Sequence, residues 1–131
     1  MAATPGAKAP VRLALGVVLA LASSSALAQG EPARGKAVFD SQCSGCHVLT
    51  GPSYAGPPLA GVVGRKAGTA PGFSYSPAMA QSGIVWDDKS LNDFLTDPAR
   101  FVPGTNMFAD LTDPQERDDV IAYLRSVSPS H

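Results

Sequence analysis

Several residue types are scarce in this chain, and their scarcity excludes some common protein classes. The 131 residues include only two Cys, two His and one Trp. Two cysteines are too few for a disulfide-stapled scaffold. Ten basic residues stand against eleven acidic ones, so the formal charge is −1. A chain without a basic excess lacks the usual means of neutralising phosphates, which predicts that nucleic acid is not a partner.

The N-terminal 28 residues have the composition of an export signal. Their only charges are Lys8 and Arg12, which precede the apolar run 13–22 (LALGVVLALA) and an A-x-A site at Ala26 to Ala28. This order is typical of a secretory signal peptide. The run is short for a membrane span, so cleavage after Ala28 is preferred over the alternative of an uncleaved anchor, and stable membrane insertion is not expected.

Cleavage leaves residues 29–131, a length typical of one domain. Eight basic residues then remain against eleven acidic ones, which gives a formal charge of −3. The signal predicts an exported, bacterial periplasmic location. Thiols in that compartment tend to oxidise unless they are chemically occupied.

Cap residues and apolar periodicity predict three main helices and one short helical turn. Residues 32–43 begin with a first-turn proline and place Gly35, Phe39 and Cys43 on one face. A second helix follows Trp86, with a cap at one of the next two aspartates and an end at position 97, before a proline. Residues 114–127 carry the clearest amphipathic pattern, with Asp113 as the cap and with Arg117, Asp118, Asp119 and Arg125 largely on the face opposite the apolar residues. The short turn spans 77–81 and is capped by Ser76.

The segments 48–75 and 98–112 are rich in Gly and Pro and show no alternation that would form a sheet. They are expected to be loops. Two loops of this length in a small domain usually serve a function or wrap around something. No internal repeat or second domain is visible.

Both cysteines lie in one motif, Cys43-Ser44-Gly45-Cys46-His47, which is C-x-x-C-H. This spacing is the signature of c-type haem attachment, because two thiols on one helical turn can each bond a haem vinyl group and the histidine lies beside the iron. A redox dithiol would be expected in a βαβ context, which is not seen. A zinc site would need a second pair of ligands.

An iron held by His47 on one side raises the question of the opposite ligand, which is commonly Met or His in electron-transfer proteins. The other histidine, His131, is the last residue. Met79 lies in a helical turn and could simply fill core space. Met107 lies in an irregular loop with no periodicity to explain it, and it is the preferred sixth ligand.

Five stretches, taken together and in this order, resemble the class I c-type cytochromes, in particular mitochondrial cytochrome c and its small soluble bacterial relatives. They are GKAVFDSQCSGCH, AGPPLAGVVGRKAG, APGFSYS with GIVW, DPARFVPGTNMF and ERDDVIAYL. They cover almost all of residues 29–131. The resemblance implies an all-α cytochrome c fold, with three main helices, short helical turns and long loops around one covalently bound haem.

The resemblance also implies a role for each matching residue. Cys43 and Cys46 correspond to the thioether anchors, with His47 and Met107 as the axial ligands. Pro57 corresponds to the proline whose carbonyl accepts the imidazole N–H. The haem contacts implied in addition are Arg65, Tyr75 and Trp86 at the propionates, with Thr105 and Phe94 near the methionine. Gly35 and Phe39 correspond to the contact between the first and last helices, against Val120 and Tyr123.

The chain departs from the family pattern in several places. Phe94 stands where the family has a tyrosine, and Met79 where it has an asparagine, so two polar groups beside the haem are lost. Gln42, Ala99 and Asn106 occupy positions of the docking lysines of mitochondrial proteins, of which only Arg100 keeps a positive charge. Partner docking is therefore expected to differ in its electrostatics.

The expected function is a soluble, monomeric one-electron carrier with one haem c, and not an enzyme. The implied partners are redox complexes, such as a cytochrome bc1-type donor and an oxidase or reaction-centre acceptor in a respiratory or photosynthetic chain. Two alternatives remain open. One is an open-site haem enzyme of peroxidase type, and the other is a haem subunit of a larger oxidoreductase.

Overall fold

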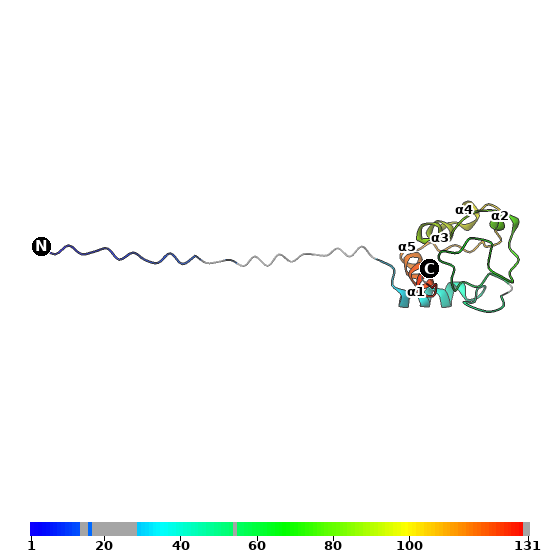
Figure 1. Cartoon of the computed structure of the whole chain (residues 1–131), viewed down its shortest axis with the longest axis horizontal. Coiled ribbons are helices and arrows are strands. Elements are labelled where there is room, and N and C mark those ends of the chain that lie inside the picture. Colours follow the sequence, from blue (N-terminus) through cyan, green and yellow to red (C-terminus); the bar gives the residue numbers. More distant parts are fainter. Residues whose placement is uncertain (14–15, 17–28, 54, 130–131) are drawn as a thin grey trace.

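The structure is a computed structural model that describes residues 1–13, 16, 29–53 and 55–129. Half of the predicted signal peptide, residues 14–15 and 17–28, lies outside the described residues, as does His131. Residues 1–13 contain no helix or strand and lie away from the helices (Figure 1). In the part of the chain that is described, no helix has the length and apolar character needed to cross a membrane.

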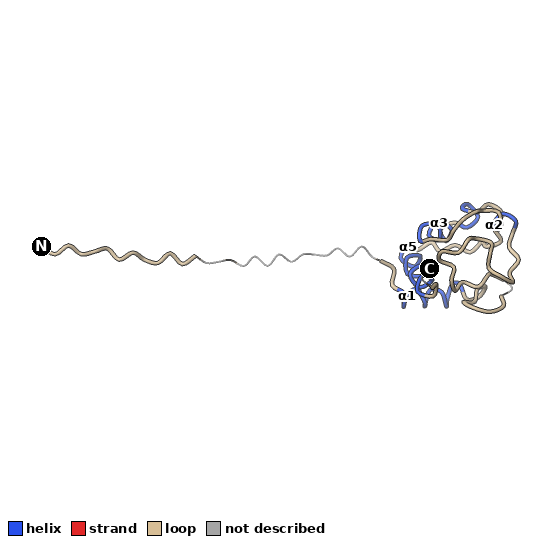
Figure 2. The backbone as a smooth tube through the Cα atoms, in the orientation of Figure 1, coloured by secondary structure: helices blue, strands red, loops and turns tan. Residues whose placement is uncertain are grey.

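The described chain is all-α. Its elements, in order, are α1(Pro32–Val38), the π-helical turn η1(Phe39–Cys43), α2(Pro77–Ala80), α3(Asp88–Thr96), α4(Pro98–Phe101) and α5(Pro114–Ser126). Residues 29–53 and 55–129 include no strand and a single isolated antiparallel bridge, between Lys66 and Val85. The longer helices α1, α3 and α5 lie on one side of the folded body, α2 lies away from them, and loops make up most of the rest (Figure 2). The predicted fold class and the absence of a sheet in this region are confirmed.

The helix starts follow from their cap residues. The Asp87 carboxylate accepts from the Ser90 backbone N–H at 2.7 Å, and the Ser90 hydroxyl accepts from the Asp87 N–H, which completes a capping box at α3. Ser76 and Asp113 cap α2 and α5 as predicted. Each of these caps satisfies N–H groups that have no partner inside the helix.

One prediction about the second long loop is wrong, because residues 98–112 begin with the helix α4. Pro98 both ends α3 and occupies the first turn of α4, where a missing N–H costs nothing. The Asp97 carboxylate caps the new helix by accepting from the Arg100 N–H at 3.1 Å. A single proline therefore separates two helices instead of opening a loop.

The first predicted helix is divided into α1 and η1. The backbone N–H of Ser44 donates to the Phe39 carbonyl at 2.9 Å, which is the wider i→i+5 spacing of a π-helix. The Ser41 hydroxyl also donates to the Ala37 carbonyl. The widened turn ends at Cys43, so it sets the direction in which the C-x-x-C-H segment leaves the helix.

Helices α1 and α5 are in direct contact, and Gly35 is the reason they can approach so closely. A Cβ at this position would lie 1.9 Å from the Asp119 carbonyl oxygen and 2.8 Å from the Tyr123 Cβ. One turn further, the rings of Phe39 and Tyr123 pack with centroids 5.7 Å apart. The predicted contact between the first and last helices is therefore present at Tyr123, and Asp119 is added to it.

Asp119 corrects a sequence-based expectation, which placed it on the solvated face of the last helix. Its side chain is only 5% exposed. The carboxylate accepts from the Glu31 backbone N–H at 2.7 Å, from Arg34 Nε at 2.9 Å and from Gln115 Nε2 at 3.1 Å. These bonds, the one from Arg34 foremost, lower the pKa of Asp119 to about 2. The residue thus joins the start of α1 to α5.

This lowered pKa leads to a pH-dependent prediction for Asp119→Asn. Because the folded-state pKa of about 2 lies below the ordinary value of 3.8, the ionised carboxylate stabilises the fold above about pH 4, and this contribution is lost as the pH falls toward 2. We expect Asp119→Asn to lower the free energy of unfolding at neutral pH by about 2 kcal/mol. Urea unfolding between pH 6 and pH 2 should show the difference between the two proteins shrinking.

The neighbouring variant Asp118→Asn is the control, because it makes the same change of charge on an exposed side chain. Its effect should stay within about 0.5 kcal/mol. Equal effects of the two substitutions would mean that net charge, and not the buried hydrogen bonds, sets the pH dependence.

Candidate functional site

The loops and helices enclose a cavity of about 270 Å³ with a mainly apolar wall. Side chains from η1, from the loops on both sides of α2, from α3, from the loop after α4 and from α5 meet there. All ten residues singled out in the sequence line it: Cys43, Cys46, His47, Pro57, Arg65, Tyr75, Trp86, Phe94, Thr105 and Met107. Residues spread over 65 positions of sequence (43–107) are thus brought to one site.

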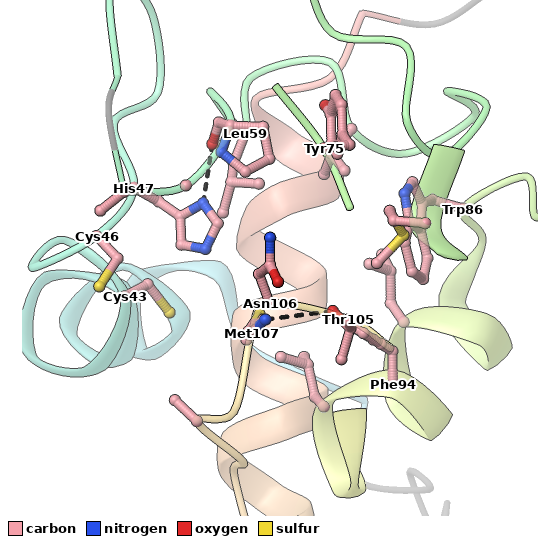
Figure 3. Close-up of a pocket in the computed structure, with 18 of the residues that line it drawn as sticks. Cys43, Cys46, His47, Leu59, Tyr75, Trp86, Phe94, Thr105, Asn106 and Met107 are labelled. Atoms are coloured by element: carbon pink, nitrogen blue, oxygen red, sulfur yellow. Dashed lines mark hydrogen bonds between the residues drawn. The ribbon is translucent and has the colours of Figure 1, made fainter. Parts of the chain in front are cut away.

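The two thiols occupy one turn of the chain, where η1 ends (Figure 3). Cys43 is half-buried and Cys46 is exposed, and both are free cysteines. Burial raises the pKa of the Cys43 thiol to about 11. A redox-active dithiol needs a thiolate near neutral pH, and Cys43 is held protonated instead. The site therefore disfavours the redox alternative.

One ring nitrogen of His47 is hydrogen-bonded to the chain, and the other is directed away from that bond. Its Nδ1–H donates to the Pro57 carbonyl oxygen at 2.8 Å (Figure 3), which is the hydrogen bond expected for a metal-binding imidazole. Gly56 lets the ring come this close, because a Cβ there would lie 2.5 Å from His47 Cε1. Burial lowers the pKa of His47, and the Arg65 charge lowers it further, against the bond to Pro57. The imidazole is neutral at pH 7, and Nε2 keeps its lone pair.

Met107 enters the cavity from the loop after α4. Its backbone N–H donates to the Thr105 hydroxyl oxygen at 3.2 Å (Figure 3), and Thr105 is buried. The Thr105 N–H in turn donates to the Val102 carbonyl at 3.0 Å. These two hydrogen bonds tie the loop that carries Met107 to Val102, the residue that follows α4. Met107 is thereby held from a different part of the chain than His47.

The remaining predicted residues form the rest of the wall. Arg65 Nη2 donates to the Pro58 carbonyl at 2.9 Å, and burial lowers the pKa of this guanidinium. The Tyr75 hydroxyl accepts from the Ala70 N–H at 3.2 Å. Trp86 and Phe94 are buried, with ring centroids 5.1 Å apart. Polar groups from Arg65, Tyr75 and Trp86 therefore lie on the mainly apolar wall of one cavity.

The sequence did not single out several other residues that line the cavity. Phe73 packs edge-on against Tyr75 with centroids 4.8 Å apart. Its position within the APGFSYS stretch was the available signal. Leu91 and Leu95 also line the cavity, from α3.

The cavity and its donor set fit a haem. The site offers two thiols on one turn, a neutral imidazole nitrogen, a thioether sulfur and one guanidinium on an apolar wall. Soft sulfur and imidazole donors suit iron in a haem. Among residues 1–13, 16, 29–53 and 55–129, no group of three His, Cys, Asp or Glu could hold a metal ion by itself.

Comparisons with known proteins agree with this geometry. The family model for cytochrome c matches residues 32–128. Cytochrome c from Tetrahymena pyriformis is 51% identical over 100 residues, which cover 76% of this chain and 91% of that protein. Cytochrome c2 from Rhodomicrobium vannielii is 49% identical over 105 residues, covering 78% and 83%.

A solved structure supports the same assignment at the level of fold. Cytochrome cH from Methylobacterium extorquens matches with a TM-score of 0.70 and 43% identity, over 74% of this chain and 99% of that one. The resemblance stated from the five sequence stretches is confirmed. The chain belongs to the cytochrome c family, whose members are electron carriers with covalently attached haem c rather than enzymes.

Proposed function

We propose that this protein is an exported one-electron carrier in which Cys43 and Cys46 anchor a single haem c, and His47 and Met107 are its axial ligands. The observation that carries this proposal is that all four side chains line one apolar cavity, from two separate parts of the chain. When bound, the haem supplies an iron that gains or loses one electron. The residues of the chain set the conditions for that exchange.

His47 is prepared for its role by the bond from Nδ1–H to Pro57, which fixes the tautomer and the ring orientation and leaves Nε2 as the donor atom. Met107 is held by the Thr105 hydroxyl. If His47 and Met107 both bind the iron, no coordination position would be left for a substrate. This favours electron transfer over the peroxidase-type alternative.

The wall controls the polarity around the haem. Phe94 and Leu124 are buried and Leu59 packs against the same core, so together they would give the haem apolar surroundings. An apolar surrounding and a thioether ligand both favour the reduced state, which raises the potential. Arg65, Tyr75 and Trp86 supply the donors that would hold the carboxylates of the haem propionates.

The proposed setting is the bacterial periplasm, with cleavage after Ala28 and a mature, monomeric chain that begins at Gln29. The export-type N-terminus supports this setting. The partners would be a cytochrome bc1-type donor and an oxidase or reaction-centre acceptor in a respiratory or photosynthetic chain. Exchange with such partners requires brief, weak contacts, which small redox interfaces usually provide.

Intact-mass measurement of the exported protein tests the attachment. We expect the mass of residues 29–131 plus one haem, and the haem should remain on the chain in denaturant. Cys43→Ala and Cys46→Ala should each leave one covalent bond, and the double variant should lose the haem in denaturant. The His47→Ala variant is the control, because it changes the iron ligand and leaves both thiols. A chain that starts at Met1 would contradict cleavage, and a haem lost from the unmodified protein would contradict the anchors.

A further inference from the structure

Residues 108–112 lead from the proposed iron ligand Met107 to the start of α5. The chain before Met107 is fixed by the Thr105 hydroxyl, which accepts from the Met107 N–H at 3.2 Å. Within the described residues, no hydrogen bond reaches 108–110, and these three residues are exposed. The next hydrogen-bonded residue along the chain is Leu111.

Leu111 is the point at which this segment rejoins the core. Its side chain is buried, and its backbone N–H donates to the Leu95 carbonyl of α3 at 2.7 Å. The Leu111 carbonyl oxygen accepts from Arg117 Nη1 at 2.7 Å, and the Thr112 carbonyl oxygen accepts from the same nitrogen at 2.9 Å. One guanidinium on α5 thus holds two successive carbonyl groups of the segment that follows Met107.

A side chain of α3 orients this guanidinium. Arg117 was expected on the solvated face of the last helix, but it is only partly exposed. Its Nε–H donates to the Asn92 side-chain oxygen at 2.8 Å. Because the donors of a guanidinium lie in fixed directions in one plane, the bond to Asn92 determines where Nη1 points. In the described ranges, none of the ion pairs involves Arg117, so its recorded partners are Asn92 and the two carbonyl groups.

We propose that Asn92 and Arg117 form a positioning pair for the sixth iron ligand, and that this pair sets how readily Met107 leaves the iron. This inference rests on the proposed function. The Met107 segment is held by Thr105 before the ligand and by Arg117 after it. Without the guanidinium, two carbonyl groups lose their donor, and the chain between Thr105 and α5 opens more easily. The methionine sulfur then spends more time away from the iron.

Displacement of the sixth ligand by imidazole measures this effect directly. In the oxidised, haem-loaded protein, imidazole can bind the iron only after Met107 has left it. At high imidazole concentration the binding rate therefore reaches a plateau, which equals the rate at which Met107 leaves. We expect Arg117→Gln to raise the plateau rate by about tenfold, close to the effect of losing one hydrogen bond from a charged group. Stopped-flow absorption measures the rate, and an unchanged plateau in this variant would overturn the proposal.

Arg125→Gln is the matched control, because it removes the same charge from the same helix. Arg125 Nη2 pairs with Asp88 of α3, and both side chains are exposed. Both variants thus lose a link between α3 and α5, but only Arg117 holds the segment after Met107. The plateau rate of Arg125→Gln should stay within about twofold of the unmodified protein. Equal increases in the two variants would overturn the proposal, since the link between the helices or the net charge would then set the rate.

Asn92→Ala provides the test if Arg117→Gln does not accumulate. It keeps the guanidinium and removes the group that orients it, so we expect the plateau rate to rise by about threefold. An unchanged rate in Asn92→Ala would overturn the positioning pair.

The same measurement separates a failure of this inference from a failure of the proposed function. If the imidazole rate of the unmodified protein rises in proportion to concentration and equals that of Met107→Ala, Met107 does not occupy the sixth position and the proposed ligand set fails. If the unmodified protein shows a plateau that Arg117→Gln leaves unchanged, only the positioning pair fails.

Discussion

Met107→Ala should convert a protein that does not bind carbon monoxide into one that does. Removing the thioether takes away the proposed sixth iron ligand and leaves only a methyl group at that position. The affinity of the reduced protein for carbon monoxide should rise by about 100-fold or more, because the methionine sulfur no longer competes for the iron. A 100-fold change corresponds to roughly 2.7 kcal/mol of binding free energy. The midpoint potential should fall, because a thioether favours the reduced iron. Optical titration with carbon monoxide and a redox titration measure the two effects.

Met79→Leu is the matched control for this prediction. Met79 is the other methionine that lines the cavity, and it is buried next to the same wall. Leucine keeps most of its volume and removes only the sulfur. The spectrum and carbon monoxide affinity should match those of the unmodified protein. If carbon monoxide bound to Met79→Leu and not to Met107→Ala, the sixth iron ligand would be Met79.

Gly35→Ala should produce a large loss of stability. The added methyl group would lie 1.9 Å from a backbone oxygen of α5, which cannot rotate away as a side chain can. The helices must separate, and the Asp119 bonds to Glu31 and Arg34 then stretch with them. We expect the free energy of unfolding to fall by about 3–5 kcal/mol. Chemical denaturation of the haem-loaded protein measures it.

Gly45→Ala provides the steric comparison, because a Cβ there meets no atom within 4 Å. Its effect on unfolding should stay below about 1 kcal/mol. If Gly35→Ala is as stable as Gly45→Ala, the close approach of α1 and α5 is not required for the fold. A failure of both variants to accumulate would leave Tyr123→Leu as the reporter of the same contact, since it removes the ring that packs on Phe39. This variant should also be destabilised.

The elements that the sequence predicted well are those with local signals. The caps Ser76 and Asp113 and the end of α3 before Pro98 depend on neighbours in sequence, and the structure has each of them. The helix α4 was missed because its proline was assigned one role, as a terminator, when it has two. Local rules identify a cap or a break, but they do not say whether a new helix follows.

Asp119 was misplaced for a different reason. Its helical position predicted solvent, and its burial depends on Glu31 and Arg34, which lie more than 80 residues away. The functional site shows the same difference between features with a local sequence signal and features that depend on distant residues. C-x-x-C-H is a local pattern and could be found directly, whereas the bond from His47 to the Pro57 carbonyl uses a backbone oxygen that every residue carries. Only the resemblance to a family predicted it.

The cavity has a consequence for the life of the chain before it acquires its haem. Without a haem, the mainly apolar wall of the cavity of about 270 Å³ lacks packing partners, which lowers the stability of a small domain whose reserve is only a few kcal/mol. The walls would then open more readily, and newly made chains would be exposed to proteases until the haem is attached. The amount of this protein in the cell would be governed by the supply of haem as well as by the rate of its own synthesis.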